Sequence, residues 1–375
     1  MKKAVFVTAA VMLVTVPGRA DVESLNLANY RPGVDRAVEK ALGFLASRMA
    51  TGGSFTDKVK NLNAVAGLAG MAFLSVGHTP GCGSYGDVVN SCIDFILSTP
   101  SDGPHGGAAK GWLGRTDIDR MYGHAIATLF LSEVSGMVDP ERQKKIDVLL
   151  PKALKVILDA QAVQKEERYA GGWRYLPDSP DSDLSISGWN LMALRSARLN
   201  GAPVPAEAIK KAIEFVNRCY NGGTGHRGPE PSTWHNWPSF NYQAGTVSAP
   251  HNAHGPSAVG LFCRELCGYH DDEINRRCAG FVMGWAGQSL QGATSPDRHS
   301  ANEYITYYAS NAMFQLGGRY WEQFAPRLFT HLITHQRDDG SWNAPSAAVY
   351  GQVYSTSMYV LSLTVSYRQL PIYQR

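Results

Sequence analysis

The sequence predicts an all-α protein, specifically a single α6/α6 toroid with six inner helices inside six outer ones. Apolar residues recur at helical spacing from about residue 30 onward, with scarcely any alternating strand pattern. Helices with one charged face alternate with helices that are small and apolar all round. The apolar helices recur about every 50 to 70 residues, which indicates a repeat architecture. Closure into a ring would leave no terminal hairpin with an uncovered apolar face.

The helices with one charged face are expected to form the outer ring. The pattern places them at residues 34–50, 85–99, 140–163, 205–220, 272–288 and 319–336. A helix that is apolar all round must be buried all round, so the other set belongs inside. The predicted inner helices are residues 62–77, 119–135, 184–199, 255–268, 302–316 and 351–368.

The N-terminal segment, residues 1–20, is expected to be a secretory signal peptide. Two lysines precede the apolar run Ala4–Val16, and small residues around Ala20 fit a cleavage site. The apolar run is too short to span a bilayer. We therefore expect residues 21–375 to form the toroid domain and to be exported, to the periplasm or the cell exterior.

The charge balance of the expected mature chain argues against nucleic acid as a partner. Without Lys2, Lys3 and Arg19, the chain has 32 basic and 32 acidic residues. No cofactor motif is present, and His251-x-x-His254 lacks a third ligand for a metal. The sequence predicts neither a membrane contact nor an oligomeric state.

The chain has six cysteines, and an oxidising compartment would permit disulfides. Cys82 lies in a predicted turn and Cys92 on the helix that follows, so we predict a local bridge between them. The partners of the other four, Cys219, Cys263, Cys267 and Cys278, stay open.

Two motifs resemble those of squalene cyclases. The spacing Gln336-x3-Gly340-x-Trp342 resembles the QW repeat of squalene and oxidosqualene cyclases, and Gln164 to Trp173 is a looser version. In residues 171–194, a Gly-Gly-Trp loop precedes Pro-Asp-Ser-Asp-Leu-Ser and an apolar helix. This stretch resembles the Pro-Asp-x-Asp-Asp-Thr-Ala motif of squalene–hopene cyclases. The whole frame is similar to the prenyltransferase and squalene oxidase repeat group.

The resemblance implies that Asp183 is a proton donor and that Asp181 is the first aspartate of the motif. Leu184 stands where the third aspartate would be. A class II cyclase protonates an alkene, and two neighbouring carboxylates raise the pKa of one of them. The other interpretation of Asp183 is a helix N-cap with no chemical role.

A cation formed in this way needs aromatic faces around it. The residues near the starts of inner helices that we predict to bind such an apolar or isoprenoid ligand are Tyr122, His124, Trp189, Trp237, His254, Tyr304, Tyr308 and Tyr354.

Three functions remain open from the sequence. The first is an isoprenoid cyclase or isomerase that uses Asp183 as general acid. The second is a non-catalytic toroid that binds a lipid or another ligand. The third is a carbohydrate-active enzyme, which would need two separated carboxylates. The candidates for those are Asp119, Asp181, Asp183 and Glu303.

Overall fold

A computed structural model describes residues 25–55, 57–58, 62–98, 110–115, 119–223, 238–290 and 302–373. The expected signal peptide lies outside these ranges. So does Trp237, one of the predicted ligand-binding residues.

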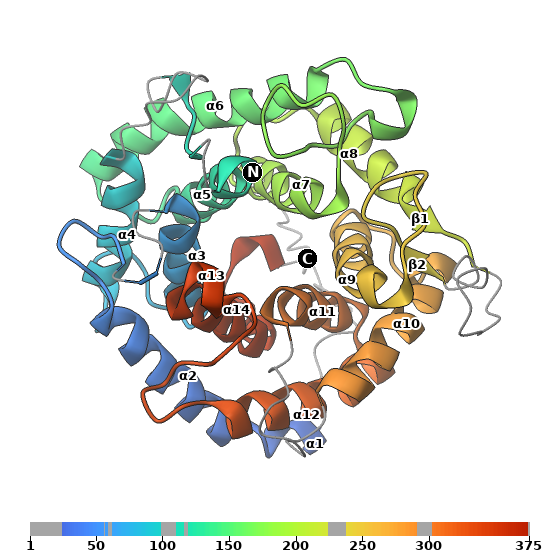
Figure 1. Cartoon of the computed structure of the whole chain (residues 1–375). Coiled ribbons are helices and arrows are strands. Elements are labelled where there is room, and N and C mark those ends of the chain that lie inside the picture. The colour runs from blue at the N-terminus through green and yellow to red at the C-terminus, as the bar shows by residue number, and fades with distance from the viewer. Residues whose placement is uncertain are drawn as a thin grey trace, which may run out of the picture.

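Within the described ranges, twelve long helices form two concentric rings, which confirms the predicted α6/α6 toroid (Figure 1). The inner helices contact one another in the closed order α3, α5, α7, α9, α11, α14 and back to α3. The outer helices are α2 (Arg31–Ser47), α4 (Gly86–Ser98), α6 (Pro140–Ala162), α8 (Ala206–Arg218), α10 (Glu273–Ser289) and α12 (Gly318–His335). The inner helices are α3 (Asn63–Leu74), α5 (Arg120–Val134), α7 (Leu184–Leu199), α9 (Pro250–Leu266), α11 (Glu303–Leu316) and α14 (Gln352–Leu363).

The structure differs from the sequence-based boundaries by five residues at two inner helices, and by three or fewer at the other helices. Helix α9 begins at Pro250, five residues before the predicted start, because proline is favoured in the first turn and the helix continues through Pro256. Helix α14 ends at Leu363, since the chain then forms short 3-10 turns and Arg368 has a positive φ.

Several short elements connect the rings. They are α1 (Leu25–Ala28), α13 (Ala347–Tyr350), three 3-10 turns at Glu167–Tyr169, Val365–Tyr367 and Pro371–Tyr373, and a sheet in which β1 (Tyr220–Asn221) pairs antiparallel with β2 (Ser239–Phe240).

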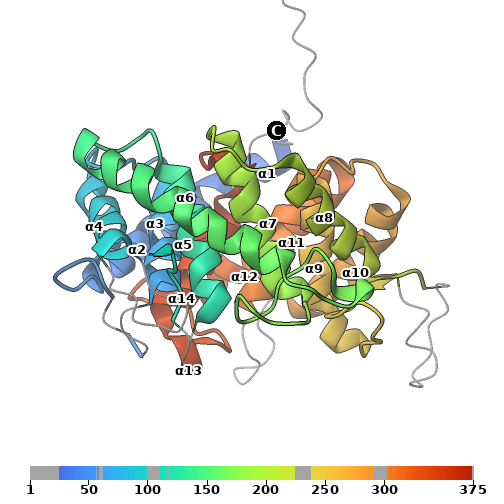
Figure 2. The same ribbon diagram turned by 90° about the horizontal axis from the view of Figure 1, so that it is seen from above.

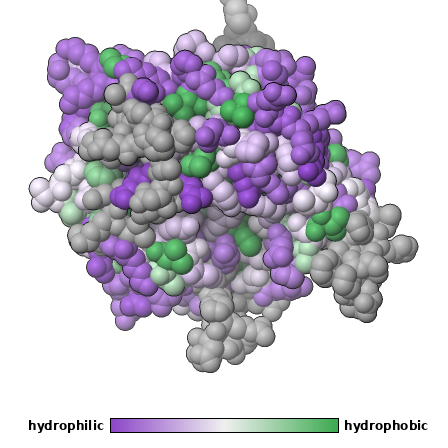
Figure 3. Space-filling model, turned by 45° about the horizontal axis from the view of Figure 1, so that its top comes forward, coloured by the Kyte–Doolittle hydropathy of each residue, from purple (hydrophilic) through white to green (hydrophobic). Residues whose placement is uncertain are grey.

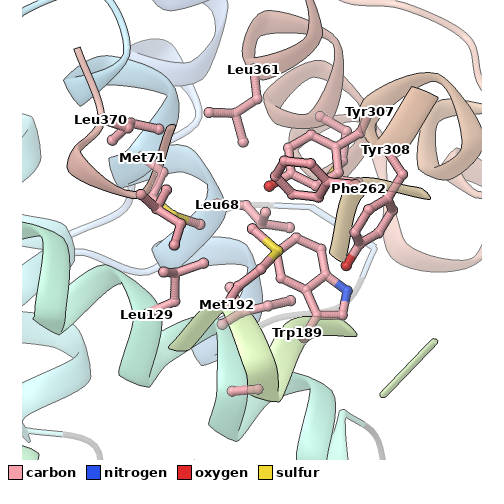
Figure 4. Packing of buried hydrophobic residues seen from close by; sticks show 14 of the residues in the cluster. Leu68, Met71, Leu129, Trp189, Met192, Phe262, Tyr307, Tyr308, Leu361 and Leu370 are labelled. Atoms are coloured by element: carbon pink, nitrogen blue, oxygen red, sulfur yellow. The ribbon is translucent and has the colours of Figure 1, made fainter. Parts of the chain in front are cut away.

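The centre of the ring is packed with apolar side chains. Figure 4 shows Leu68, Met71, Leu129 and Met192 of the inner helices meeting there, together with Leu370 from the end of the chain. Burial of this apolar surface is the main term that holds the two rings together.

Residues 370–373, here called the C-terminal plug, close one end of the ring. Leu370, Ile372 and Tyr373 are buried, and the Tyr373 carbonyl accepts a hydrogen bond of 3.0 Å from the Gln315 side chain. The amide of Ile372 donates to Glu133 of α5 over 3.3 Å. Figure 2 shows the C-terminus at the face opposite to α13.

A corner built from Gln336, Gly340 and Trp342 ties α12 to α2. The amide of Gln336 donates to the carbonyl of Gly340 over 3.0 Å and to the carbonyl of Ala37 in α2 over 2.7 Å. The indole N–H of Trp342 donates to the carbonyl of Leu332 in α12 over 2.8 Å. The predicted spacing therefore marks a junction between outer helices.

The second corner uses Gln161, so the match predicted on Gln164 was wrong in its glutamine. Gln161 donates to the carbonyls of Gly171 and Ala208, both over 2.9 Å. Trp173 donates to the carbonyl of Ile157 over 2.8 Å, as Trp342 does in the first corner. Gln164 is exposed.

We expect Gly171→Ala to destabilise the protein clearly more than Gly201→Ala. Both glycines have positive φ, +84° and +89°, which costs a residue with a Cβ about 1–2 kcal/mol. A Cβ at Gly171 would also lie 2.3 Å from the Lys211 carbonyl oxygen, whereas a Cβ at Gly201 meets nothing within 4 Å. Overpacking typically adds about 1–3 kcal/mol. Urea denaturation of both variants measures the difference, and equal losses would contradict the close packing.

The ring is closed by contacts between the two ends of the described chain. Asp57 accepts a hydrogen bond of 2.6 Å from the amide of Val353 at the start of α14. Gly351 leaves room for that carboxylate, because a Cβ there would lie 2.1 Å from Asp57 Oδ1. The Gln336 corner likewise joins α12 to α2.

All six cysteines are free thiols, so the predicted Cys82–Cys92 bridge was wrong. Cys92 is fully buried on the inward face of α4, and burial raises its pKa. Cys82 is exposed in the preceding turn. The two side chains therefore belong to opposite environments, which their short separation in sequence does not reveal.

The outer surface is mainly hydrophilic. In Figure 3, purple and white residues cover most of the face shown, and green residues are scattered among them. None of the described helices is both long and apolar enough to cross a membrane.

Candidate functional site

A chamber of about 680 Å³ lies at the N-terminal end of the inner ring, a size typical of small-molecule sites. All inner helices run in the same direction, because an outer helix returns the chain between each inner helix and the next. Their first turns therefore converge on one space, near α13 and opposite the C-terminal plug (Figures 1 and 2). Each inner helix contributes to the wall, for example Val65, Tyr122, Trp189, Gly255, Tyr304 and Tyr354.

Aromatic side chains form much of the chamber wall. Four of the predicted ligand-binding residues line it, namely Tyr122, Trp189, Tyr304 and Tyr354. Sequence reasoning missed Tyr242 and Tyr350, because they precede inner helices in irregular or short segments that carry no helical pattern. Aliphatic side chains from α3, α5 and α11 form a further part of the wall. Polar side chains complete it, namely Asp119, Ser185, Ser248, His251, Asn252, Asn302 and Ser346.

Tyr308 lies behind the wall. Its ring packs edge-on against Trp189 with 5.5 Å between centroids, and Tyr307 stacks on the same indole at 5.4 Å (Figure 4). Tyr308 is fully buried, and its hydroxyl has no hydrogen-bond partner in the part of the chain that the structure describes. Its ring therefore supports Trp189 and does not face the ligand space.

The predicted ligand residue His124 also lies outside the chamber. Its side chain points toward α6, where Nε2 pairs with the Ala153 carbonyl over 3.1 Å. Its Nδ1 accepts from the Leu113 amide over 3.2 Å, which places the proton on Nε2. Burial lowers the pKa of His124 to about 4, so the ring is neutral. We assign it a structural role.

His254 packs against the outer ring. Its imidazole lies 4.8 Å from the ring of Phe281 in α10, and it does not line the chamber. Burial, with a smaller effect of His251, lowers the pKa of His254 to about 4. On α9 it is His251, one turn earlier, that reaches the chamber wall.

Asp183 is the N-cap of α7 and is fully buried outside the chamber wall. Its Oδ1 accepts the Ile186 amide over 2.9 Å, and its Oδ2 accepts Nη1 of Arg174 over 2.8 Å. Burial raises the pKa of Asp183 to about 6, although the Ile186 amide, Arg174 and the Tyr242 hydroxyl all favour the ionised form. Both oxygens are thus already used by the protein.

Asp181 shares the guanidinium of Arg174, with 3.4 Å between Nε and Oδ2. It also accepts a hydrogen bond of 3.1 Å from Gln243, and its side chain is about one-third exposed at 35%. The predicted pair of aspartates is therefore bridged by one arginine outside the chamber.

Asp119 is the carboxylate that does reach the chamber. Oδ1 accepts the Arg115 amide over 2.7 Å, whereas Oδ2 makes no hydrogen bond of good geometry with any described residue. Gly123 leaves space for it, since a Cβ there would lie 2.0 Å from Oδ2. Burial raises the pKa of Asp119 to about 6, and the amides of Arg115 and Ala64 offset this only in part.

Glu303, at the start of α11, is buried beside the chamber. Neither of its oxygens makes a hydrogen bond of good geometry with the described residues. Burial raises its pKa, and Ser346 offsets this in part. Its charge helps to raise the pKa of the chamber tyrosine Tyr354, after the larger effect of burial.

Four carboxylates stand at the N-terminal ends of inner helices, where the helix dipoles place partial positive charge. They are Asp57 at α14, Asp119 at α5, Asp183 at α7 and Glu303 at α11. Among the described wall residues there is no lysine or arginine. The carboxylates therefore offset much of the partial positive charge at the converging helix ends.

Across the described ranges, no group of three or more His, Cys, Asp or Glu side chains could hold a metal ion.

No family model and no curated protein matches this chain. Solved structures do. The α-1,6-mannanase GH76A of Salegentibacter sp. HEL1_6 superposes with a TM-score of 0.56 at 10% identity, covering 90% of this chain and 99% of that one.

Two further structures superpose comparably. The type II terpene cyclase MstE from Scytonema gives a TM-score of 0.54 at 12% identity, over 90% of this chain and 100% of that one. A protein from Actinoplanes gives 0.54 at 13% identity, over 89% and 99%. At these identities the similarity concerns the fold, which is a terpenoid-cyclase-like α/α toroid shared with GH76 mannanases.

Proposed function

We propose that this protein binds an uncharged molecule of the isoprenoid class in the chamber and isomerises it by proton transfer, with Asp119 as the acid. One observation carries the proposal: among the described residues, one carboxyl group, with an oxygen that makes no hydrogen bond of good geometry, lines a wall rich in aromatic side chains. Its pKa of about 6 keeps a protonated fraction available near neutral pH.

The wall suits the cation that protonation of an alkene creates. Faces of tyrosine and tryptophan attract cations, most strongly where water is excluded. The carboxylates at the helix ends add negative charge around the same space. Asp119 takes the role that the motif suggested for Asp183, because the oxygens of Asp183 already bind Arg174 and Ile186.

The charge distribution also limits the ligand. A prenyl diphosphate would need cationic side chains or uncompensated helix N-termini to bind its phosphates. The four carboxylates offset those termini. We therefore propose a ligand without a phosphate group.

A carbohydrate ligand is the second candidate, because a mannanase and a terpene cyclase share the fold about equally. Rings such as Trp189 can pack against a sugar. A glycosidase, however, uses two carboxyl groups that flank the bond to be cleaved. In the described wall Asp119 is the one carboxylate, and Glu303 does not line the chamber.

We also propose that the protein is exported. Support comes from residues 1–20, whose lysines, apolar run and small residues match a secretory signal.

The ligand itself tests the proposal. Native mass spectrometry of the protein purified from its source is expected to release an uncharged isoprenoid, and recovery of a glycan would overturn the assignment. Added geranylgeraniol should raise the melting temperature, because a ligand that binds only the folded state stabilises it. α-1,6-Mannotriose should not.

A matched pair of variants ties binding to the chamber. Gly255→Leu fills space in the wall, where a Cβ would already lie 3.7 Å from Ile305, and should abolish the thermal shift. Gly280→Leu adds the same side chain to outer helix α10, where a Cβ meets nothing within 4 Å. That control should keep the shift. Loss in both variants, or in neither, would contradict binding in the chamber.

A further inference from the structure

Three hydroxyl groups from three inner helices form a row in the chamber wall. The Tyr122 hydroxyl of α5 donates to Ser185 Oγ of α7 over 2.8 Å. Ser185 Oγ in turn lies 2.5 Å from the Tyr304 hydroxyl of α11. All three residues line the chamber. We call Tyr122, Ser185 and Tyr304 the hydroxyl row.

The hydroxyl row has one hydroxyl proton that is not donated to any acceptor within the row. Three hydroxyls carry three protons, and two hydrogen bonds consume two of them. Because Tyr122 donates to Ser185, the remaining proton belongs to Ser185 or Tyr304. Neither hydroxyl bonds to a further acceptor within the ranges that the structure describes. Burial, the main cause, raises the pKa of both tyrosines, so they stay protonated and neutral.

The neighbouring hydroxyl network is different because it ends on a charge. The Tyr242 hydroxyl pairs with that of Tyr175 over 2.7 Å and accepts from Arg174 over 3.3 Å. It also hydrogen-bonds to Asp183, which accepts the remaining proton. That network is complete within the protein, whereas the hydroxyl row is open toward the chamber.

A hydroxyl donor that faces the chamber favours a ligand with a hydrogen-bond acceptor. Once a ligand displaces water from the chamber, a hydroxyl proton without an acceptor costs free energy, and a ligand oxygen at hydrogen-bond distance would remove that cost. Consecutive hydrogen bonds also polarise one another, which strengthens the last donor in the row. A hydrocarbon would leave the donor unsatisfied.

We propose that the hydroxyl row is a subsite that donates a hydrogen bond to an oxygen atom of the ligand. The chamber then prefers an isoprenoid that carries a carbonyl group over a hydrocarbon of the same shape. This inference rests on the proposed function and narrows its substrate class. Asp119 is the N-cap of α5, Tyr122 lies in the first turn of that helix, and both line the chamber, so the bound oxygen would share that space with the acid.

Two ligands of equal shape test the subsite. Geranylacetone carries a ketone, and its partner is the hydrocarbon in which a methylene group replaces the carbonyl. Quenching of Trp189 fluorescence measures binding of both, compared with Trp189→Phe to correct for the other tryptophans. The wild-type protein is expected to bind the ketone about tenfold more tightly, the size of one well-formed hydrogen bond that relieves an unsatisfied donor.

The triple variant Tyr122→Phe, Ser185→Ala, Tyr304→Phe removes every hydroxyl of the row and keeps both rings. It should lose the preference for the ketone and still bind the hydrocarbon, which shows that the chamber is intact. Tyr308→Phe is the matched control, because its hydroxyl lies one turn away on α11 but outside the chamber. It should keep the tenfold preference.

The outcomes separate the two ideas. Equal binding of both ligands to the wild type, or a preference that persists in the triple variant, would overturn the subsite alone. Failure of both ligands to bind the wild type would overturn the proposed function and the subsite with it.

Discussion

Asp119→Asn is expected to abolish turnover of the chamber's ligand and, above pH 6, to raise the free energy of unfolding. Turnover is lost because asparagine has no acidic proton. Stability rises because burial raises the pKa of Asp119 from 3.8 to about 6 in the folded state. The stabilising contribution of the protonated group is present below pH 3.8 and lost as pH rises to about 6. The variant should recover up to about 3 kcal/mol, since one pKa unit is about 1.4 kcal/mol.

Asp183→Asn is the matched comparison. Asparagine still caps α7 at Ile186. The ion pair with Arg174 is lost, but the change also removes a carboxylate whose pKa burial raises to about 6, and the two effects oppose each other. Above pH 6 the free energy of unfolding should therefore change by less than the rise expected for Asp119→Asn. Turnover should persist. Urea denaturation and rates from pH 4 to 8 measure both effects, and wild-type activity should decline above pH 6. If Asp183→Asn is inactive and Asp119→Asn is active, Asp183 is the acid and the assignment to Asp119 is wrong.

Glu133→Gln is expected to stabilise the protein by up to about 3 kcal/mol at pH 8 and not at pH 4. Glu133 is fully buried on α5 next to the C-terminal plug, and burial raises its pKa from 4.5 to about 7. Hydrogen bonds from Ser196 and Ile372 favour the charged form but offset this only in part. Stability linked to the protonated group is therefore present below pH 4.5 and lost as pH rises to about 7.

Glutamine can keep both contacts of Glu133, since its oxygen accepts the Ile372 amide and its nitrogen donates to Ser196. Thermal or urea unfolding at several pH values measures the effect. Glu141→Gln on the exposed face of α6 is the control, with a change expected within about 0.5 kcal/mol. A Glu133→Gln protein that is less stable at pH 8 would contradict a destabilised buried charge.

The architecture could be predicted because the apolar and polar faces of a helix follow from the spacing of residues in the local sequence. Every residue of α3 is buried, and the absence of a polar face in Asn63–Leu74 indicated both a helix and its place inside. Helix α9 was predicted to begin five residues too late, since its first turn, from Pro250, carries no run of small apolar residues like the one that follows. The two-residue strands β1 and β2 are too short to leave any alternating pattern.

The chamber could be predicted only in part. In a helix buried all round, periodicity does not tell which side faces the ligand space. Tyr304 and Tyr308 are one turn apart on α11, yet the first lines the chamber and the second packs behind Trp189.

Only the structure could indicate which of two aspartates is available as the acid. Asp119 and Asp183 both precede inner helices, and the motif favoured Asp183. What separates them is Arg174, which lies nine residues before Asp183 and binds its carboxylate in the folded chain. Local sequence carries no sign of that contact.

The bonds that close the ring also decide when it can assemble. Asp57 and Val353 are 296 residues apart, and Gln336 and Ala37 are 299 residues apart. Contacts between such distant positions require most of the chain to be ordered first, which slows folding. During synthesis, the apolar faces of α2 and α3 that contact α12 and α14 stay uncovered until those two helices have been made. A chain that ends before α14 would thus be an open arc with exposed apolar surface, prone to associate with other apolar surfaces. The toroid is complete only when α14 has been made.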